Sequence, residues 1–146
     1  MGFGFGIDPK MERTFVMLKP DALQRGLAGE IIKRLEGKGY RIQKAETMQL
    51  DPDLLREHYR HVSDQPFYPE MEAYMTSGPV LAMIIEGKDV IRGVRMLMGA
   101  TRFEEALPGT IRGDLAGSTT KNLIHGADSP ENAEKEIRRF FGDRKA

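Results

Sequence analysis

Residues 80–85 read Val-Leu-Ala-Met-Ile-Ile and residues 15–18 read Phe-Val-Met-Leu, two unbroken apolar runs of strand length. Runs without polar alternation are typical of strands that are covered on both faces at the middle of a sheet. Residues 41–50 mix charged and apolar side chains, which indicates an outer strand, and the short pair Leu123-Ile124 indicates another edge. The sequence therefore predicts four strands, with 15–18 and 80–85 at the centre.

Helical patterns separate these strands. Apolar residues recur at helical spacing in 27–35, which stops at Gly37-Lys38-Gly39, and in 90–98, which stops at Gly99. A third pattern covers 130–141, where Ser129 is the expected cap and Pro130 fits the first helical position. With an extra helical pair between residues 53 and 77, this order predicts an α/β protein. Its expected fold is a ferredoxin-like α/β sandwich, a four-stranded antiparallel sheet with helices on one face.

The segment 100–121 is too long for an ordinary connection and is rich in Gly, Thr, Arg and Pro. Long structured loops usually serve function, so we expect an active-site loop here. The first ten residues read as an expression leader because Met11 opens a second sensible start. We then expect residues 11–146 to form one domain.

Composition narrows the possible partners. Lys plus Arg equals Asp plus Glu at 22 each, so no global field attracts nucleic acid or an anionic membrane. The chain has no cysteine, which excludes disulfides, thiolate chemistry and cysteine-bound zinc. It also shows no signal sequence and no run of eighteen apolar residues, so we expect a cytoplasmic protein.

Residues 122–129, Asn-Leu-Ile-His-Gly-Ala-Asp-Ser, place His125 between an apolar run and a helix start. An imidazole with an ordinary pKa of roughly 6.5 is mostly neutral near pH 7.5 and has a lone pair for attack on an electrophile. Gly126 is expected to leave room for a large reactant. A structural role is the commoner outcome for a lone histidine, but Asn122, Asp128 and Glu136 supply orienting groups that packing would not need.

Three cationic side chains are candidate phosphate ligands. Lys19 follows a central strand and precedes Pro20, although a solvated strand-end lysine is the commoner outcome. Arg112 lies in the glycine-flanked stretch 108–114, where a salt bridge with Asp114 is an equal alternative. Arg95 borders the apolar stripe of its helix and could face a cleft or water.

Other signals are weaker. His58 and His61 lie i, i+3 on a probable helix but lack a third metal ligand, so we interpret them as surface histidines. The sequence contains neither a Walker loop nor a Gly-x-Gly-x-x-Gly turn, so side chains would have to bind any phosphate. A neutral histidine among cationic side chains predicts phosphoryl transfer to nitrogen.

Four motifs in this order and spacing resemble those of nucleoside diphosphate kinase, over residues 11–141. They are Lys-Pro-Asp at 19–21, Ser-Gly-Pro at 77–79, Pro-Gly-Thr-Ile-Arg-Gly-Asp at 108–114 and Asn-x-x-His-Gly at 122–126. The resemblance implies a ping-pong enzyme that moves the γ-phosphoryl group of a nucleoside triphosphate, with Mg²⁺, onto His125 and then onto a nucleoside diphosphate. It also implies a homo-oligomer, a hexamer or a tetramer.

The resemblance assigns further roles residue by residue. Tyr59 and Glu136 match positions around the imidazole, and Phe67 matches the aromatic on which the base stacks. Asp128 is the candidate metal-contacting residue, through water or nucleotide phosphates. The positions that match those holding phosphates and sugar hydroxyls in the family are Lys19, Arg95, Thr101, Arg112 and Asn122.

The chain departs from the family pattern at Ala22, at Arg102-Phe103, at Thr119 in the base clamp and at Ala127, where serine is usual. None of these changes removes a group that transfer requires. Ala127 and Thr119 motivate an alternative, a non-catalytic oligomeric scaffold or regulator that retains the fold. A nucleic-acid-binding protein is a third possibility, supported by Phe67 and local arginines and opposed by the balanced charge.

Overall fold

The computed structural model describes residues 11–142 of the 146-residue chain. The predicted leader, residues 1–10, lies outside the described residues, and the single domain over 11–146 stays a prediction. The helices, 3₁₀ turns and strands follow in the order β1 (Met11–Leu18), α1 (Pro20–Gln24), α2 (Ala28–Gly37), β2 (Arg41–Met48), α3 (Pro52–His58), η1 (Arg60–Val62), α4 (Tyr68–Met75), β3 (Val80–Lys88), α5 (Val90–Met98), η2 (Phe103–Glu105), α6 (Ile111–Leu115), β4 (Ile124–Gly126) and α7 (Pro130–Phe141).

The four strands form one antiparallel sheet in the order β2-β3-β1-β4. The two apolar runs lie at its centre, as predicted, and pair with each other from Met11 opposite Lys88 to Leu18 opposite Leu81. The expected outer strands occupy the two edges. The class, the four-stranded antiparallel sheet and the helical connections predicted from the sequence are therefore confirmed.

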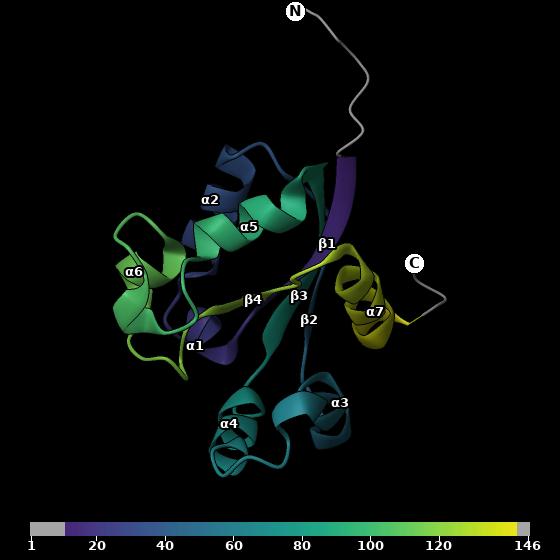
Figure 1. Cartoon of the computed structure of the whole chain (residues 1–146), viewed down its shortest axis with the longest axis vertical. Helices are drawn as coiled ribbons and strands as arrows, with labels where there is room; N and C mark the ends of the chain where they lie inside the picture. Colours follow the sequence, from purple (N-terminus) through teal and green to yellow (C-terminus); the bar gives the residue numbers. More distant parts are fainter. Residues whose placement is uncertain (1–10, 143–146) are drawn as a thin grey trace, which may run out of the picture.

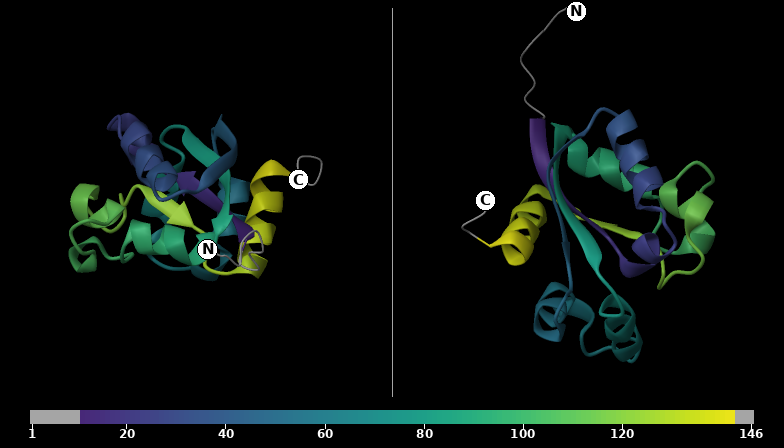
Figure 2. Two further views of the ribbon diagram at one scale, coloured as in Figure 1. Left: turned by 90° about the horizontal axis from the view of Figure 1, so that it is seen from above. Right: turned by 180° about the vertical axis from the view of Figure 1, so that it is seen from behind.

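Helices cover both faces of this sheet, so the prediction of helices on one face is wrong (Figure 1, Figure 2). The reason lies in the pleat of β1, where successive side chains point to opposite faces. Val16 and Leu18 pack under α2 and α5, whereas Phe15 and Met17 pack against α3, α4 and α7. A strand that is apolar at every position needs a cover on each side.

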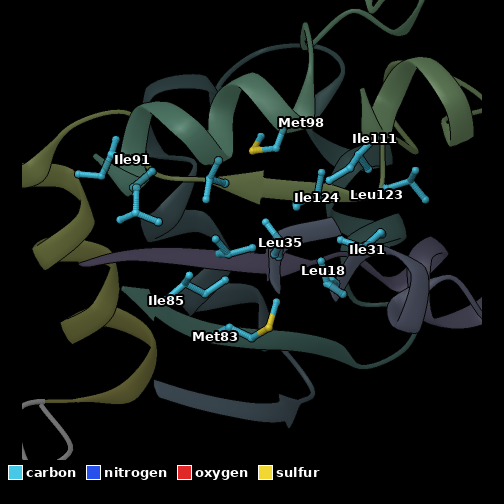
Figure 3. Packing of buried hydrophobic residues seen from close by; sticks show 14 of the residues in the cluster. Leu18, Ile31, Leu35, Met83, Ile85, Ile91, Met98, Ile111, Leu123 and Ile124 are labelled. Carbon is cyan, nitrogen blue, oxygen red and sulfur yellow. The ribbon is translucent and has the colours of Figure 1, made fainter. Parts of the chain in front are cut away.

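The core under α2 and α5 is the larger of the two clusters. Ile31 and Leu35 descend from α2 onto Leu18, Met83 and Ile85 of the sheet (Figure 3). Ile111, Leu123 and Ile124 extend this cluster beneath the 100–121 segment. The long loop is thus anchored to the main core at its middle, through Ile111, and just after its C-terminal end.

The predicted helix ends are confirmed. α2 ends at Gly37 and α5 at Met98, before Gly99, which has a φ of 86° that favours glycine. Ser129 caps α7 by accepting a hydrogen bond from the Asn132 amide at 3.1 Å. α1 and α6 were not predicted, because helices of five residues are too short to show an apolar period.

Within residues 11–142, no helix has the length and apolar character needed to cross a bilayer.

Gly113 makes a close approach inside the 100–121 loop, and we expect Gly113→Ala to destabilise the fold by roughly 3 kcal/mol. A Cβ atom at this position would lie 1.9 Å from the Leu107 carbonyl oxygen, which is backbone and cannot swing aside. Gly117→Ala is the matched control in the same loop, because a Cβ there would meet nothing within 4 Å. Urea unfolding of both variants measures the difference, and equal stabilities would contradict the prediction.

Candidate functional site

A cavity of about 770 Å³ opens where the 100–121 loop, α3 and α7 meet the ends of β1 and β4. Nine of the ten candidate site residues line it. Those nine are Lys19, Tyr59, Arg95, Thr101, Arg112, Asn122, His125, Asp128 and Glu136. Residues that lie far apart in the sequence, from Lys19 to Glu136, therefore meet at one surface.

A strained turn at residues 122–124 positions His125 at the cavity. Leu123 has a φ of 77°, and the Ile124 amide donates to the Asn122 carbonyl at 2.9 Å, which closes a three-residue γ-turn. Ile124 and Gly126 then point into the core under α5, so the alternation of β4 turns His125 to the opposite face, beside Phe15. Strained backbone of this kind tends to occur at functional sites.

His125 has its two ring nitrogens in different surroundings. Nε2 lies 2.8 Å from Glu136 Oε1, and a carboxylate can only accept, so Nε2 carries the proton and Nδ1 keeps a free lone pair. Burial, with Lys19, Arg112 and Arg95 nearby, lowers the pKa of His125 to about 3. Its side chain is still 22% exposed, so the neutral imidazole can be reached from the cavity.

We expect acid to unfold this protein through its buried histidines. The pKa values of His58 and His125 are lowered to about 3, mainly by burial, against roughly 6.5 in an unfolded chain. The unfolded chain therefore binds more protons between these values, and the free energy of unfolding should fall from pH 7 to pH 4 by on the order of 3 kcal/mol for each histidine. Glu136, whose pKa burial raises, offsets part of the loss.

Urea unfolding at each pH measures this dependence. His58→Phe removes one of the two groups, so its stability should fall about half as steeply below pH 6.5. The same slope in both proteins would contradict the assignment.

Lys19 is tied to the loop through Asn122. Its Nζ donates to Asn122 Oδ1 at 2.8 Å, and Asn122 Nδ2 donates to the Thr101 carbonyl at 3.2 Å. Burial, followed by the charge of Arg112, lowers the pKa of Lys19 to about 7. The alternative interpretation of Lys19 as a solvated lysine at a strand end is therefore wrong.

Arg112 connects the loop to β4. Its guanidinium donates to the carbonyls of Asn122 and Gly99, each at 3.2 Å, and to that of Ile124. Burial lowers its pKa to about 10, so it stays charged near pH 7. The alternative of a salt bridge with Asp114 is wrong, because Asp114 pairs with Arg34 at 2.9 Å.

Arg95 and Asp128 lie at the rim of the cavity. Arg95 is largely exposed and donates to the Gly126 carbonyl at 3.1 Å. Asp128 Oδ1 accepts from Asn132 Nδ2 at 2.6 Å, and that bond lowers the pKa of the carboxyl group. Magnesium prefers about six oxygen ligands, and Asp128 supplies one exposed carboxylate, so most ligands of a bound ion would have to come from phosphates and water.

A second donor group lies deeper. One nitrogen or oxygen atom from each of His58, His125 and Glu136 falls within 4.8 Å of the others. Two imidazoles and one carboxylate are ligands typical of transition metals and do not match the oxygen preference of Mg²⁺.

Phe67 is the candidate that the structure does not bring to the cavity. It is 52% exposed, precedes α4 and is absent from the cavity lining. Base stacking on Phe67 stays a prediction. Tyr59 does lie in the cavity, with its ring against that of His58 at 4.7 Å between centroids.

His58 is the functional candidate that the sequence interpretation missed. It is only 7% exposed, so describing it as a surface histidine is wrong. Its ring lies 4.7 Å from that of His125, at an angle of 81°. The missed signal is its position three residues after the buried Leu55, which places it on the inward face of α3.

Gly126 has a different role from the one predicted. A Cβ atom there would lie 2.8 Å from Met98 Sδ and 3.2 Å from Val94 Cγ1, both on α5. The glycine therefore permits α5 to pack closely on β4, and the prediction that it leaves room for a reactant is wrong.

The match between the chain and known proteins extends over this whole arrangement. A family model described as nucleoside diphosphate kinase matches residues 12–146. The chain belongs to the nucleoside diphosphate kinase family. The nucleoside diphosphate kinase of Moorella thermoacetica is 53% identical over 131 residues, which cover 90% of this chain and 94% of that protein.

Other relatives agree. Nucleoside diphosphate kinase A2 of Xenopus laevis is 51% identical, over 90% of this chain and 86% of that protein. The apo crystal structure of nucleoside diphosphate kinase from Encephalitozoon cuniculi has a TM-score of 0.88 and 48% identity, with 90% of each chain covered. The structure of the Halobacterium salinarum nucleoside diphosphate kinase in complex with CDP has a TM-score of 0.87 and 50% identity, covering 91% of this chain and 89% of that one.

The departures from the family pattern leave the cavity intact. Ala127 is 1% exposed and belongs to the core under α5, where a methyl group needs no partner. Thr119 accepts from the Phe103 amide at 3.3 Å and donates to Glu104 at the same distance, so it closes the loop on itself. These two changes motivated the scaffold alternative, and neither of them alters Lys19, Arg112, Asn122, His125 or Glu136.

Proposed function

We propose that this nucleoside diphosphate kinase family member transfers the γ-phosphoryl group of a nucleoside triphosphate to a nucleoside diphosphate through a phosphohistidine at His125. The observation that carries the proposal is the hydrogen bond from Nε2 to Glu136, which leaves a neutral Nδ1 lone pair beside a cavity lined by Lys19 and Arg112. Nucleotide phosphate transfer follows from family membership, and the residue roles belong to the proposal.

The first half-reaction uses the free nitrogen. The Nδ1 lone pair attacks the γ-phosphorus, a P–N bond forms, and the P–O bond to the β-phosphate breaks, so its electron pair leaves with the nucleoside diphosphate. Nε2 keeps its proton, the phosphorylated ring becomes cationic, and the Glu136 carboxylate faces that charge. In the second half, a terminal oxygen of another nucleoside diphosphate attacks phosphorus and the P–N pair returns to Nδ1.

Cationic side chains supply the electrostatic part. Phosphoryl transfer needs in-line positioning and neutralisation of oxygen charge more than covalent help. Lys19, Arg95 and Arg112 line the cavity and are the proposed sources of this charge, and Asn122 accepts a 2.8 Å hydrogen bond from Lys19 that supports its role. Thr101 and Asn122 complete the proposed phosphate and sugar contacts. Tyr59 and Glu136 are the proposed neighbours of the imidazole, and Phe67 is the proposed base platform.

Magnesium belongs to the proposal as an ion that enters with the nucleotide. When bound, it would neutralise charge on the transferring phosphates, with Asp128 contacting it through water. Homo-oligomerisation as a hexamer or tetramer and a cytoplasmic location also stay predictions. Light scattering on the purified protein measures the oligomer.

Labelling tests the proposed function. Incubation of the full chain with ATP labelled at the γ-phosphate and Mg²⁺ should produce an acid-labile, base-stable label on His125. Addition of unlabelled GDP should then move the label to GTP. A chain that binds nucleotide without taking up or passing on the label would contradict the proposal and favour the scaffold alternative.

A further inference from the structure

Arg139 contacts the histidine behind the nucleophile. It lies three residues after Glu136 on α7, so the two side chains share one face of the helix. Glu136 bonds His125 at 2.8 Å, and Arg139 Nη1 lies 3.0 Å from His58 Nδ1. We propose that Arg139 and His58 are positioning residues that hold the His125 imidazole with Nδ1 free for attack. This inference rests on the proposed function.

The Arg139 contact determines where the proton of His58 lies. A guanidinium is always protonated and can only donate, so His58 Nδ1 must accept. A neutral imidazole that accepts at Nδ1 carries its proton on Nε2. Arg139 therefore holds His58 in one tautomer and opposes its protonation, and the burial of His58 acts in the same direction.

His58 in turn restricts the ring of His125. The two rings meet edge to face, at 4.7 Å and 81°, and Phe140 contacts His58 at 5.0 Å and 78°. Phe15 approaches the His125 ring at 6.0 Å. Rotation of His58 would break its bond to Arg139, so a fixed His58 gives His125 a fixed surface to pack against.

An uncharged His58 also suits the intermediate. In the proposed reaction the His125 ring becomes cationic while it carries the phosphoryl group. A protonated His58 at 4.7 Å would repel that ring, whereas the tautomer that Arg139 imposes adds no charge on the neighbouring imidazole.

Packing alone does not explain Arg139. Its side chain is 18% exposed, and its Nε has no hydrogen-bond partner among residues 11–142, with the Glu57 carboxylate 3.5 Å away. A charged group that is mostly buried and incompletely bonded costs stability, which an apolar residue of similar size would avoid. Beside this long ion pair with Glu57, the hydrogen bond of Arg139 is the one to His58 Nδ1, at 3.0 Å.

A double-mutant cycle in the full chain tests the inference. We expect Arg139→Leu to lower kcat about 3- to 10-fold with KM nearly unchanged, because it disturbs the nucleophile and not the nucleotide contacts. In the His58→Phe background the same substitution should change kcat by less than about 1.5-fold, since Arg139 then has no nitrogen to orient. Arg139→Lys, which keeps a donor, should recover part of the loss.

Arg138→Leu is the matched control. It removes the same charge from the adjacent, exposed position of α7 and should leave kcat unchanged. An equal fall in kcat for Arg139→Leu with and without His58, or an equal fall for Arg138→Leu, would overturn the inference.

Nitrogen NMR of the His125 ring separates this inference from the proposed function. In wild-type protein labelled with ¹⁵N-histidine, Nε2 should be protonated and Nδ1 bare at pH 7. Arg139→Leu should shift both resonances toward an averaged pair of tautomers, and Arg138→Leu should not. Failure of the wild type to transfer phosphate would end the proposed function, whereas ring resonances unaffected by Arg139→Leu would end the positioning role.

Discussion

Replacing His125 with alanine should abolish phosphoryl transfer, with a fall in kcat of roughly 10⁴-fold or more, as expected for loss of a covalent nucleophile. Lys19 could act as a substitute nucleophile only by breaking its 2.8 Å hydrogen bond to Asn122. Glu136 bonds Nε2, so it lies on the side of the imidazole opposite the reacting Nδ1 and is not positioned to replace it. A coupled assay from ATP to a second nucleoside diphosphate measures the loss.

Nucleotide binding provides the control for this substitution. Lys19, Arg112 and Asn122 are held by contacts that do not involve His125, so His125→Ala should bind ATP with a Kd within a few-fold of the wild type. A variant that binds ATP and still transfers at more than a hundredth of the wild-type rate would place the nucleophile elsewhere.

The centre of the sheet and the ends of the long helices could be predicted from local sequence. Residues 15–18 and 80–85 are apolar at every position, and only a doubly covered strand tolerates that pattern. The same apolar pattern also requires helices on both faces of the sheet. The expected sandwich with helices on one face did not take account of this requirement. The helices α1 and α6 could not be predicted, because Pro20 and the cap Thr110 begin helices of only five residues.

That His125 and the cationic side chains would gather at one cavity could be predicted because their neighbours in sequence, such as Asn122 and Pro20, are informative. The support behind them could not, because it depends on contacts between distant elements. His58 reaches His125 across 67 positions of sequence, and Arg139 reaches His58 across 81. Gly126 shows the converse, since its neighbour His125 suggested a catalytic reason for a residue that α5 requires for packing.

We expect kcat/KM for the nucleotide to decline as the pH rises through neutrality, because Lys19 loses its proton. Burial and the charge of Arg112 lower its pKa to about 7, so the free protein loses this cation as the pH rises through 7. Only the ammonium form attracts phosphate, and kcat/KM for the nucleotide should therefore fall about tenfold per pH unit well above pH 7. Lys19→Gln should lower kcat/KM about 100-fold at pH 6.5, where the wild-type ammonium is largely formed.

A bound nucleotide should shift this decline to higher pH. Its polyphosphate favours the charged form of Lys19, which raises the pKa of that amine in the complex, so kcat should hold to a higher pH than kcat/KM. Lys19→Arg is the matched variant, because a guanidinium stays charged across this range while nucleotide ionisation is the same for both proteins. The ratio of the wild-type kcat/KM to that of Lys19→Arg should therefore fall between pH 7 and pH 9. Nucleotide ionisation cancels in this ratio, so a ratio that does not change with pH would mean that Lys19 titrates far above 7 and that its burial does not lower its pKa.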